Sequence, residues 1–171
     1  ETRVVHCPSA NLKLGSGIAR VARMRAAGVT VGLGADGAPC NNNLDPWLEM
    51  RHAALVSAGT VGPGVLPAQE VLRMATIEGA RVLGLAHEIG SLEVGKRADL
   101  VVVGTAAPHA APAPDPVSTL VYATQARDVE HVFVGGCPVV AAGQLVTLDA
   151  DRVVRIAREQ APRLSRRAKL A

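Results

Sequence analysis

The sequence predicts an α/β fold, and three observations along the chain support this. In the first half, short apolar runs alternate with segments of helical apolar spacing, the order expected of a parallel β-α-β arrangement. The second half carries short β-type runs separated by glycine turns. A charged segment with helical spacing comes last. We therefore expect three successive units, at residues 1–86, 87–148 and 149–171.

Composition favours a folded chain with a buried core. Of 171 residues, 49% are hydrophobic and 19% charged, which argues against a disordered chain. One Trp, one Tyr and one Phe leave little material for stacking nucleic-acid bases. No apolar run reaches the roughly 18 residues of a membrane span, the first residues lack a secretion signal, and the three cysteines suggest no disulfide framework. We expect a cytoplasmic protein that binds neither nucleic acid nor a membrane.

The first unit opens with a β-α-β pattern. An apolar run that ends at Pro8 predicts a buried strand, and a loop is expected over residues 9–17. Helical spacing then predicts a helix over residues 18–27, before Gly28. Alternate apolar residues predict a second strand over residues 29–33, parallel to the first.

Three further helices complete the first unit. Asp45 is a good N-terminal cap and Pro46 suits the first helical position, so a helix is expected up to Gly59. Similar start signals predict helices from Pro67 to Met74 and from Thr76 to Leu83.

The second unit is predicted to be mostly β. Gly135-Gly136 is a good hairpin signal, and Gly143-Gln144 is a weaker one. The prolines of residues 105–116 indicate an exposed loop. The β-type runs are residues 100–103, 129–134, 138–141 and 145–146.

The third unit is a basic helix. It is expected over about residues 150–161 and should end at Pro162. Residues 149–171 hold seven Lys and Arg against three Asp and Glu, whereas the rest of the chain is nearly neutral. Such a tail can contact phosphate groups, but a solvated terminal helix is the favoured interpretation.

Asp36 and His6 are the most informative polar residues. Asp36 follows the second strand between two glycines, where parallel α/β folds build their sites, although an aspartate there can equally start a turn. His6 ends the first strand and should share the same rim of the sheet, although a lone histidine is more often structural. The other histidines show no ligand spacing, so no complete metal site is predicted.

Loop amides are the other candidate binding groups. Asn11 and the run at residues 41–43 can bind the polar edge of a heterocycle, although turn formation is favoured for the run. Ser9 and Ser16 lack a nucleophile-elbow motif and a fixed base, so serine hydrolysis is not expected.

Three motifs, in this order, resemble the amidohydrolase superfamily. They are HCPSANLKLGSG at residues 6–17, GADGAPCNN at residues 34–42 and GSLEVGKRADLVV at residues 90–102. They are most similar to the branch that contains methylthioadenosine/S-adenosylhomocysteine deaminases, 8-oxoguanine deaminases and triazine chlorohydrolases.

The resemblance implies that the chain is the C-terminal portion of a family member. Residues 1–86 would supply the last strands and helices of a (β/α)8 TIM barrel. Residues 87–148 would supply part of a small composite β-sandwich, and residues 149–171 a C-terminal helix and basic tail. The resemblance implies an N-terminally incomplete chain that is inactive by itself and forms a homo-oligomer when full length.

The family resemblance also assigns site residues. Family members bind a divalent metal with a His-x-His after the first strand, histidines after the fifth and sixth strands, and an aspartate after the eighth. Asp36 matches that aspartate and is expected to be both metal ligand and catalytic base. His6 matches a position after the seventh strand that shapes the pocket, and with Asn11 it is assigned to substrate binding. Zn2+ is favoured over Fe2+ because no redox role is suggested.

The implied activity is hydrolysis of a non-peptide carbon–nitrogen bond. The expected substrate is an aminopurine nucleoside derivative or a related aminated heterocycle such as a triazine. Asp36 would deprotonate a metal-polarised water and pass the proton to departing ammonia, while a glutamate outside this sequence protonates the ring nitrogen. The alternative is a non-catalytic amidohydrolase remnant that acts as a folding or assembly module.

Overall fold

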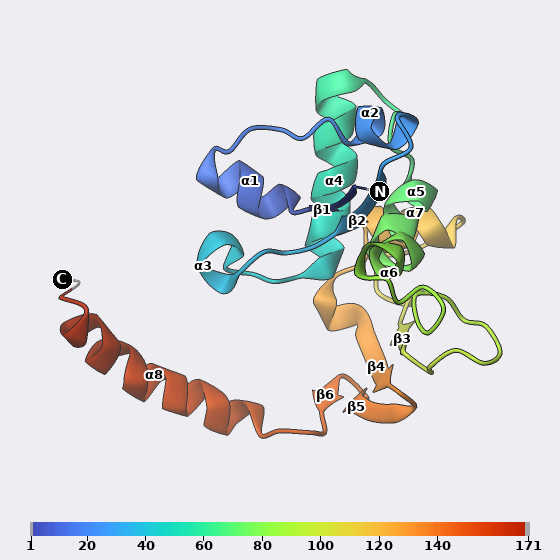
Figure 1. Cartoon of the computed structure of the whole chain (residues 1–171). Coiled ribbons are helices and arrows are strands. Elements are labelled where there is room, and N and C mark those ends of the chain that lie inside the picture. Colours follow the sequence, from blue (N-terminus) through green and yellow to red (C-terminus); the bar gives the residue numbers. More distant parts are fainter. Residues whose placement is uncertain (1, 170–171) are drawn as a thin grey trace.

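The computed structural model describes residues 2–169, and Figure 1 shows the arrangement of their helices and strands. Strands β1 (Arg3–His6) and β2 (Thr30–Leu33) pair in parallel, and helix α2 (Val21–Ala26) lies between them in sequence. The predicted β-α-β order is therefore confirmed. Helix α2 begins later than expected, but Gly28 follows it with φ 80°, a left-handed value that glycine adopts easily.

The segment after β1 differs from the prediction. Residues 9–17 were expected to form a loop, but helix α1 (Pro8–Leu14) occupies most of this range. Pro8 suits the start of the helix because the first turn leaves backbone amides without intrahelical partners. Gly15 ends the helix in the left-handed conformation. A proline that stops a strand can thus also begin a helix.

Four helices lie between β2 and the next strand. The three predicted ones are confirmed as α4 (Pro46–Val61), α5 (Ala68–Ala75) and α6 (Ile77–Leu83). The short helix α3 (Ala38–Asn41) was not predicted. As expected, Asp45 caps α4, because its side chain accepts hydrogen bonds from Trp47 N at 2.9 Å and from Leu48 N at 3.4 Å.

The hydrophobic core joins these helices to β2. Val31 of β2 is fully buried, and Val4 of β1, its partner in the sheet register, packs against the same cluster. Strand β2 also packs closely against α6. A Cβ added at Gly32 of β2 would lie 2.9 Å from Gly79 Cα of α6, so there is no room for a side chain at this point. The buried cluster comprises Val21, Val31, Met50, Ala53, Ala54, Leu66, Val71, Met74 and Val121.

The second half forms a four-stranded antiparallel sheet, as the β-type runs predicted. The Gly135-Gly136 hairpin joins the second and third of its strands, and the turn at residues 142–143 joins the third and fourth. The strands, in their order across the sheet, are β3 (Leu100–Val103), β4 (Val129–Val134), β5 (Cys137–Ala141) and β6 (Gln144–Leu145).

Helix α7 (Pro116–Tyr122) and the short 3-10 helix η1 (Ala126–Asp128) lie between β3 and β4. The prediction of a loop over residues 105–116 is correct up to Asp115, but the helix after it was missed. Asp115 accepts hydrogen bonds from Val117 N and Ser118 N, so the Asp-Pro start signal of α4 is repeated here.

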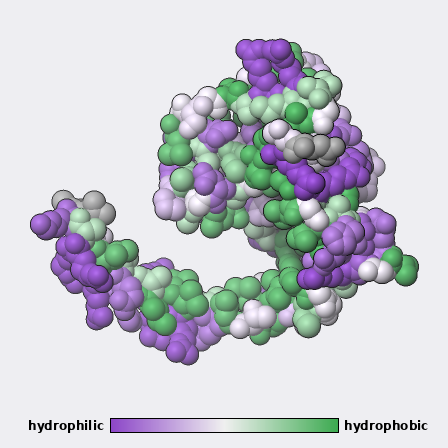
Figure 2. All heavy atoms as spheres, viewed as in Figure 1, coloured by the Kyte–Doolittle hydropathy of each residue, from purple (hydrophilic) through white to green (hydrophobic). Residues whose placement is uncertain are grey.

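Helix α8 (Ala150–Arg167) extends away from the rest of the molecule (Figure 1). It continues through Pro162, where it was expected to end. Every residue of α8 is exposed, so water can satisfy the carbonyl that a proline leaves unbonded. Figure 2 shows hydrophobic as well as hydrophilic surface on this helix, and open space between it and the body. Among residues 2–169, no helix has the length and apolar character of a bilayer span.

Candidate active site at the ends of β1 and β2

The carboxyl ends of β1 and β2 lie side by side, as the sequence predicts. His6 is the register partner of Leu33, and Gly34 N donates a hydrogen bond to His6 O at 3.0 Å. The position of Gly34 needs a glycine, because an added Cβ would lie 2.5 Å from Val5 Cγ1. The segments that follow the two strands therefore start from one edge of the sheet.

Asp36 lies in the segment that leaves β2 and is exposed. Its backbone has φ 61°, and its Oδ1 accepts a hydrogen bond from Gly37 N at 2.7 Å. The turn-forming role left open by the sequence is therefore present. That bond is the only one to the Asp36 side chain within residues 2–169, so Oδ2 is free to accept a further partner.

His6 is buried, with 6% of its surface exposed. Because alternate side chains of a strand share a face, His6 lies on the side of β1 from which Val4 reaches the core. Its Nδ1 has no hydrogen-bond partner among the described residues. Burial lowers the pKa of His6, and the nearby Glu49 carboxylate opposes that shift. A neutral imidazole is therefore favoured at this position.

Asn11 lies in α1 and is half-buried. Its backbone carbonyl accepts a hydrogen bond from Ser16 N at 3.0 Å, which closes the turn after the helix. Ser9, in the first turn of α1, bonds His52 Nδ1 of α4 through its hydroxyl at 2.8 Å. This bond attaches α1 to α4.

Glu49 is a polar residue of this region that the sequence did not predict. It belongs to α4, has 2% of its surface exposed, and accepts hydrogen bonds from Ser9 N at 3.1 Å and Asn41 Nδ2 at 2.6 Å. An acidic residue near the start of a helix is ordinarily explained by the helix dipole, so its position gave no distinct signal. Asn41 is likewise buried, and its Oδ1 accepts hydrogen bonds from Asn43 N at 3.2 Å and Leu44 N at 3.0 Å, so the turn formation favoured for the run at residues 41–43 is present.

The comparison with known families decides the relationship. Residues 1–139 match the amidohydrolase family. This chain belongs to the amidohydrolase family. Its mixed α/β fold is accordingly that of amidohydrolase-fold enzymes, and the family resemblance drawn from the three motifs is confirmed.

Two similar relatives of this amidohydrolase chain are deaminases. A 5-methylthioadenosine/S-adenosylhomocysteine deaminase of Moorella thermoacetica is 52% identical over 88% of the chain and 35% of the relative. The corresponding deaminase of Desulforudis audaxviator is 51% identical over 94% of the chain and 38% of the relative.

Solved structures agree. An adenosine deaminase of Xanthomonas campestris with bound zinc is 39% identical, with TM-score 0.91 over 94% of this chain and 37% of that one. The zinc-containing atrazine chlorohydrolase of Arthrobacter aurescens is 31% identical, with TM-score 0.81 over 91% of this chain and 35% of that one. The amidohydrolase chain thus spans little more than a third of these relatives, between 35 and 38%.

Asp36 fits one position of a divalent metal site. Its carboxylate is exposed, and its Oδ2 has no hydrogen bond within residues 2–169. A carboxylate oxygen of this kind is a suitable ligand for Zn2+ or Fe2+. Within residues 2–169, however, no group of three or more His, Cys, Asp or Glu side chains is placed to hold a metal ion. The described part of the amidohydrolase chain therefore holds one candidate ligand and not a complete site.

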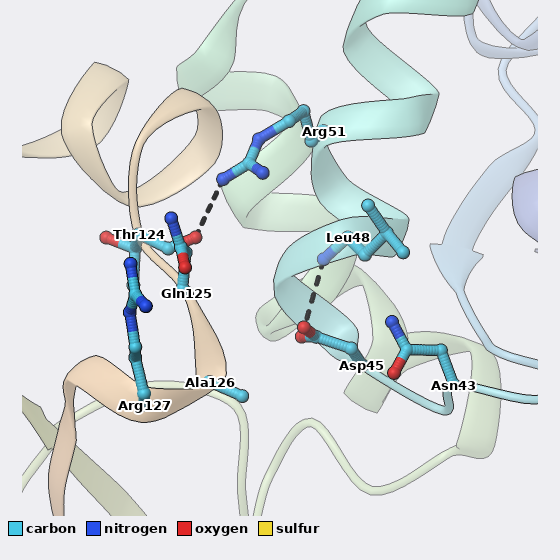
Figure 3. Close-up of a pocket in the computed structure, with 8 residues that line it drawn as sticks. All are labelled: Asn43, Asp45, Leu48, Arg51, Thr124, Gln125, Ala126 and Arg127. Carbon is cyan, nitrogen blue, oxygen red and sulfur yellow. Dashed lines mark hydrogen bonds between the residues drawn. The ribbon is translucent and has the colours of Figure 1, made fainter. Parts of the chain in front are cut away.

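A hollow of about 330 Å³ lies elsewhere, between the start of α4 and the segment at residues 124–127 (Figure 3). Two of its polar side chains already make hydrogen bonds within the protein. Asp45 caps α4, and Arg51 Nη2 donates to Thr124 O at 2.7 Å. Asp36, His6 and Asn11 do not line it. The hollow is therefore a junction between helices and separate from the candidate site.

Proposed function

We propose that the protein containing this chain is a metal-dependent amidohydrolase that deaminates an aminopurine nucleoside derivative. The single observation that supports this most is Asp36, an exposed carboxylate at the end of a parallel strand, with a free oxygen. The substrates named in the 52% and 51% identical relatives, methylthioadenosine and S-adenosylhomocysteine, are the first candidates. An aminated triazine is the second candidate, on the weaker likeness to a chlorohydrolase.

Asp36 would act as a metal ligand and as a general base. A bound divalent metal supplies a water whose pKa is lowered to about 7, so that a nucleophile exists near neutral pH. In such a site Asp36 would hold the metal, orient the attacking water, accept its proton and help to deliver that proton to the departing ammonia. The hydrogen bond from Gly37 N to Oδ1 fixes the carboxylate during both transfers.

The remaining assignments belong to the same proposal. His6 shapes the substrate pocket, and the Asn11 amide binds the polar edge of the heterocycle. Zinc is favoured over iron as the metal, which the zinc-bound relatives support. The complete protein would form a (β/α)8 barrel, assemble as a homo-oligomer and reside in the cytoplasm. Its three free cysteines agree with a reducing compartment.

The decisive experiment replaces Asp36 in the full-length protein. Asp36→Asn keeps the shape of the side chain but removes the base, so turnover of methylthioadenosine and S-adenosylhomocysteine should be almost abolished, as measured by ammonia release. Asp99→Asn is the matched control, because Asp99 is also exposed and also accepts a hydrogen bond from a glycine amide, Gly135 N at 2.6 Å. The control should retain activity. Near-normal turnover by Asp36→Asn would remove the assignment.

A further inference from the structure

Glu49 is a buried carboxylate that the proposed mechanism does not use. With 2% of its surface exposed, it has lost almost all its contact with water. No Lys or Arg among residues 2–169 forms an ion pair with it. Its two oxygens are instead satisfied by two N–H donors, Ser9 N and Asn41 Nδ2. A buried charge of this kind is costly, so a residue held only for packing would more simply be apolar.

The two donors come from the two segments that leave the sheet. Ser9 lies in α1, directly after β1, whereas Asn41 is the last residue of α3, after β2. Glu49 itself belongs to α4, so one carboxylate joins three elements. Ser9 is tied to α4 a second time by the bond from its hydroxyl to His52, one helical turn after Glu49.

A continuous set of hydrogen bonds connects Glu49 with the residue before Asp36. Asn41 Nδ2, which donates to Glu49, also donates to Ala35 O at 2.8 Å. The side-chain oxygen of Asn41, Oδ1, accepts a hydrogen bond from Leu44 N at 3.0 Å. Asn41 is therefore bonded on both sides of its amide and fixes the segment that carries Asp36.

We propose that Glu49 is a positioning residue that sets the orientation of Asp36. It acts through Asn41 and the Ala35 carbonyl, and it holds the segment after β1 at the same time. What Asp36 does once positioned rests on the proposed function; that Glu49 fixes its segment does not.

The test uses Glu49→Gln in the full-length protein. Glutamine keeps the length but offers one acceptor oxygen instead of two, so its amide NH2 must face a donor from Ser9 or Asn41. Loss of such an outer-shell partner typically costs 10 to 100-fold in activity or metal affinity. We expect kcat to fall by about that factor and KM to change much less, because no direct contact with substrate is removed.

Glu78→Gln is the matched control. Glu78 is also a buried carboxylate, but it belongs to α6 and is held by Arg73 at 2.9 Å and Arg81 at 2.6 Å. Both substitutions should lower thermal stability, whereas only Glu49→Gln should lower kcat. An equal kcat in the two variants would overturn the proposal.

A second readout does not depend on activity. Hydrogen–deuterium exchange of residues 35–44 should be faster in Glu49→Gln than in Glu78→Gln, while exchange of β2 stays the same in both. Unchanged exchange at residues 35–44 would contradict the proposal even if the enzyme were inactive on every substrate tried. If wild type does not deaminate but exchange responds as expected, only the proposed function fails.

Asn41→Ala protects the test against a Glu49→Gln variant that does not fold. It keeps the Glu49 carboxylate and the bond from Ser9, and it removes the link to Ala35. We expect faster exchange at residues 35–44 and a loss of kcat similar to that of Glu49→Gln. Wild-type exchange and kcat in Asn41→Ala would exclude a positioning role through this link.

Discussion

Asp36 and Glu49 show two uses of a carboxylate within one small region. Asp36 is exposed and retains a free oxygen, so it can meet a ligand. Glu49 is buried and has both oxygens bonded, so it can only hold structure. The difference follows from the number of N–H donors around each group, because a buried carboxylate must be satisfied whereas an exposed one uses water.

Glu49 also acts on His6 through its charge, and this gives a prediction at the residue scale. Burial holds the pKa of His6 below 6.5 and Glu49 partly offsets that effect. Glu49→Gln should therefore lower the pKa of His6 still further, because it removes the charge that favours the imidazolium. An NMR titration of the His6 ring protons would measure this.

Glu78→Gln serves as control, since the His6 titration should not respond to it. Because the folded-state pKa is the lower one, the unfolded chain binds more protons between the two values. The contribution of neutral His6 to stability is therefore lost as the pH falls from about 6.5 through the folded-state value. A His6 pKa above 6.5 would show that the ring is not desolvated as described.

At the element scale, two helices share one start signal. Asp45-Pro46 begins α4 and Asp115-Pro116 begins α7, and each aspartate accepts two backbone N–H groups. The first was predicted and the second missed, because the surrounding prolines of residues 105–116 favour a loop. An Asp-Pro pair therefore predicts the start of a helix when it stands alone, but not when several other prolines surround it.

Replacement of the cap of α4 should destabilise the whole fold. Asp45→Ala leaves Trp47 N and Leu48 N without their acceptor, and we expect a loss of about 1 kcal/mol in the free energy of unfolding. Asp149→Ala is the control, because Asp149 caps the fully exposed α8 through Arg152 N. That variant should reduce helical circular dichroism without shifting the urea midpoint of the core. Equal midpoint shifts in the two variants would show that α4 does not contribute to the core as described.

The strands and the longer helices were predictable because their signals are local and repeated. Apolar runs bounded by proline or glycine defined β1 to β5, and helical apolar spacing with caps defined α4 to α6. Helices α1 and α3 were missed because both are short and both are bonded to Glu49, which lies 40 residues from Ser9 and 8 residues from Asn41. The same reason explains the candidate site: Asp36 follows a strand, whereas Glu49 gains its role only through folding.

At the scale of the whole molecule, the chain presents much apolar surface to solvent. Val5 in the parallel sheet is 51% exposed, Val101 in the second sheet 49%, and Leu164 in α8 65%. The parallel sheet has two strands within residues 2–169, and in that part of the chain neither outer edge of this sheet has a strand partner. Such surfaces are ordinarily covered by other parts of a protein or by a partner.

We therefore expect the isolated 171-residue chain to self-associate. Size-exclusion chromatography with light scattering should give a mass above the 17.6 kDa of one chain. Replacing Val153, Ile156 and Leu164 of α8 by serine should reduce the mass without abolishing association, because the sheet surfaces remain. A compact monomer that unfolds cooperatively would contradict this expectation.

The contact between Gly32 and Gly79 brings the main chains of a strand and a helix together with no side chain between them. Glycine at position 32 is needed for this spacing, because the Cβ of any other residue would press on Gly79 and force the strand and the helix apart. The placement of Asp36, a few residues beyond Gly32, consequently depends on a position that has no room for a side chain.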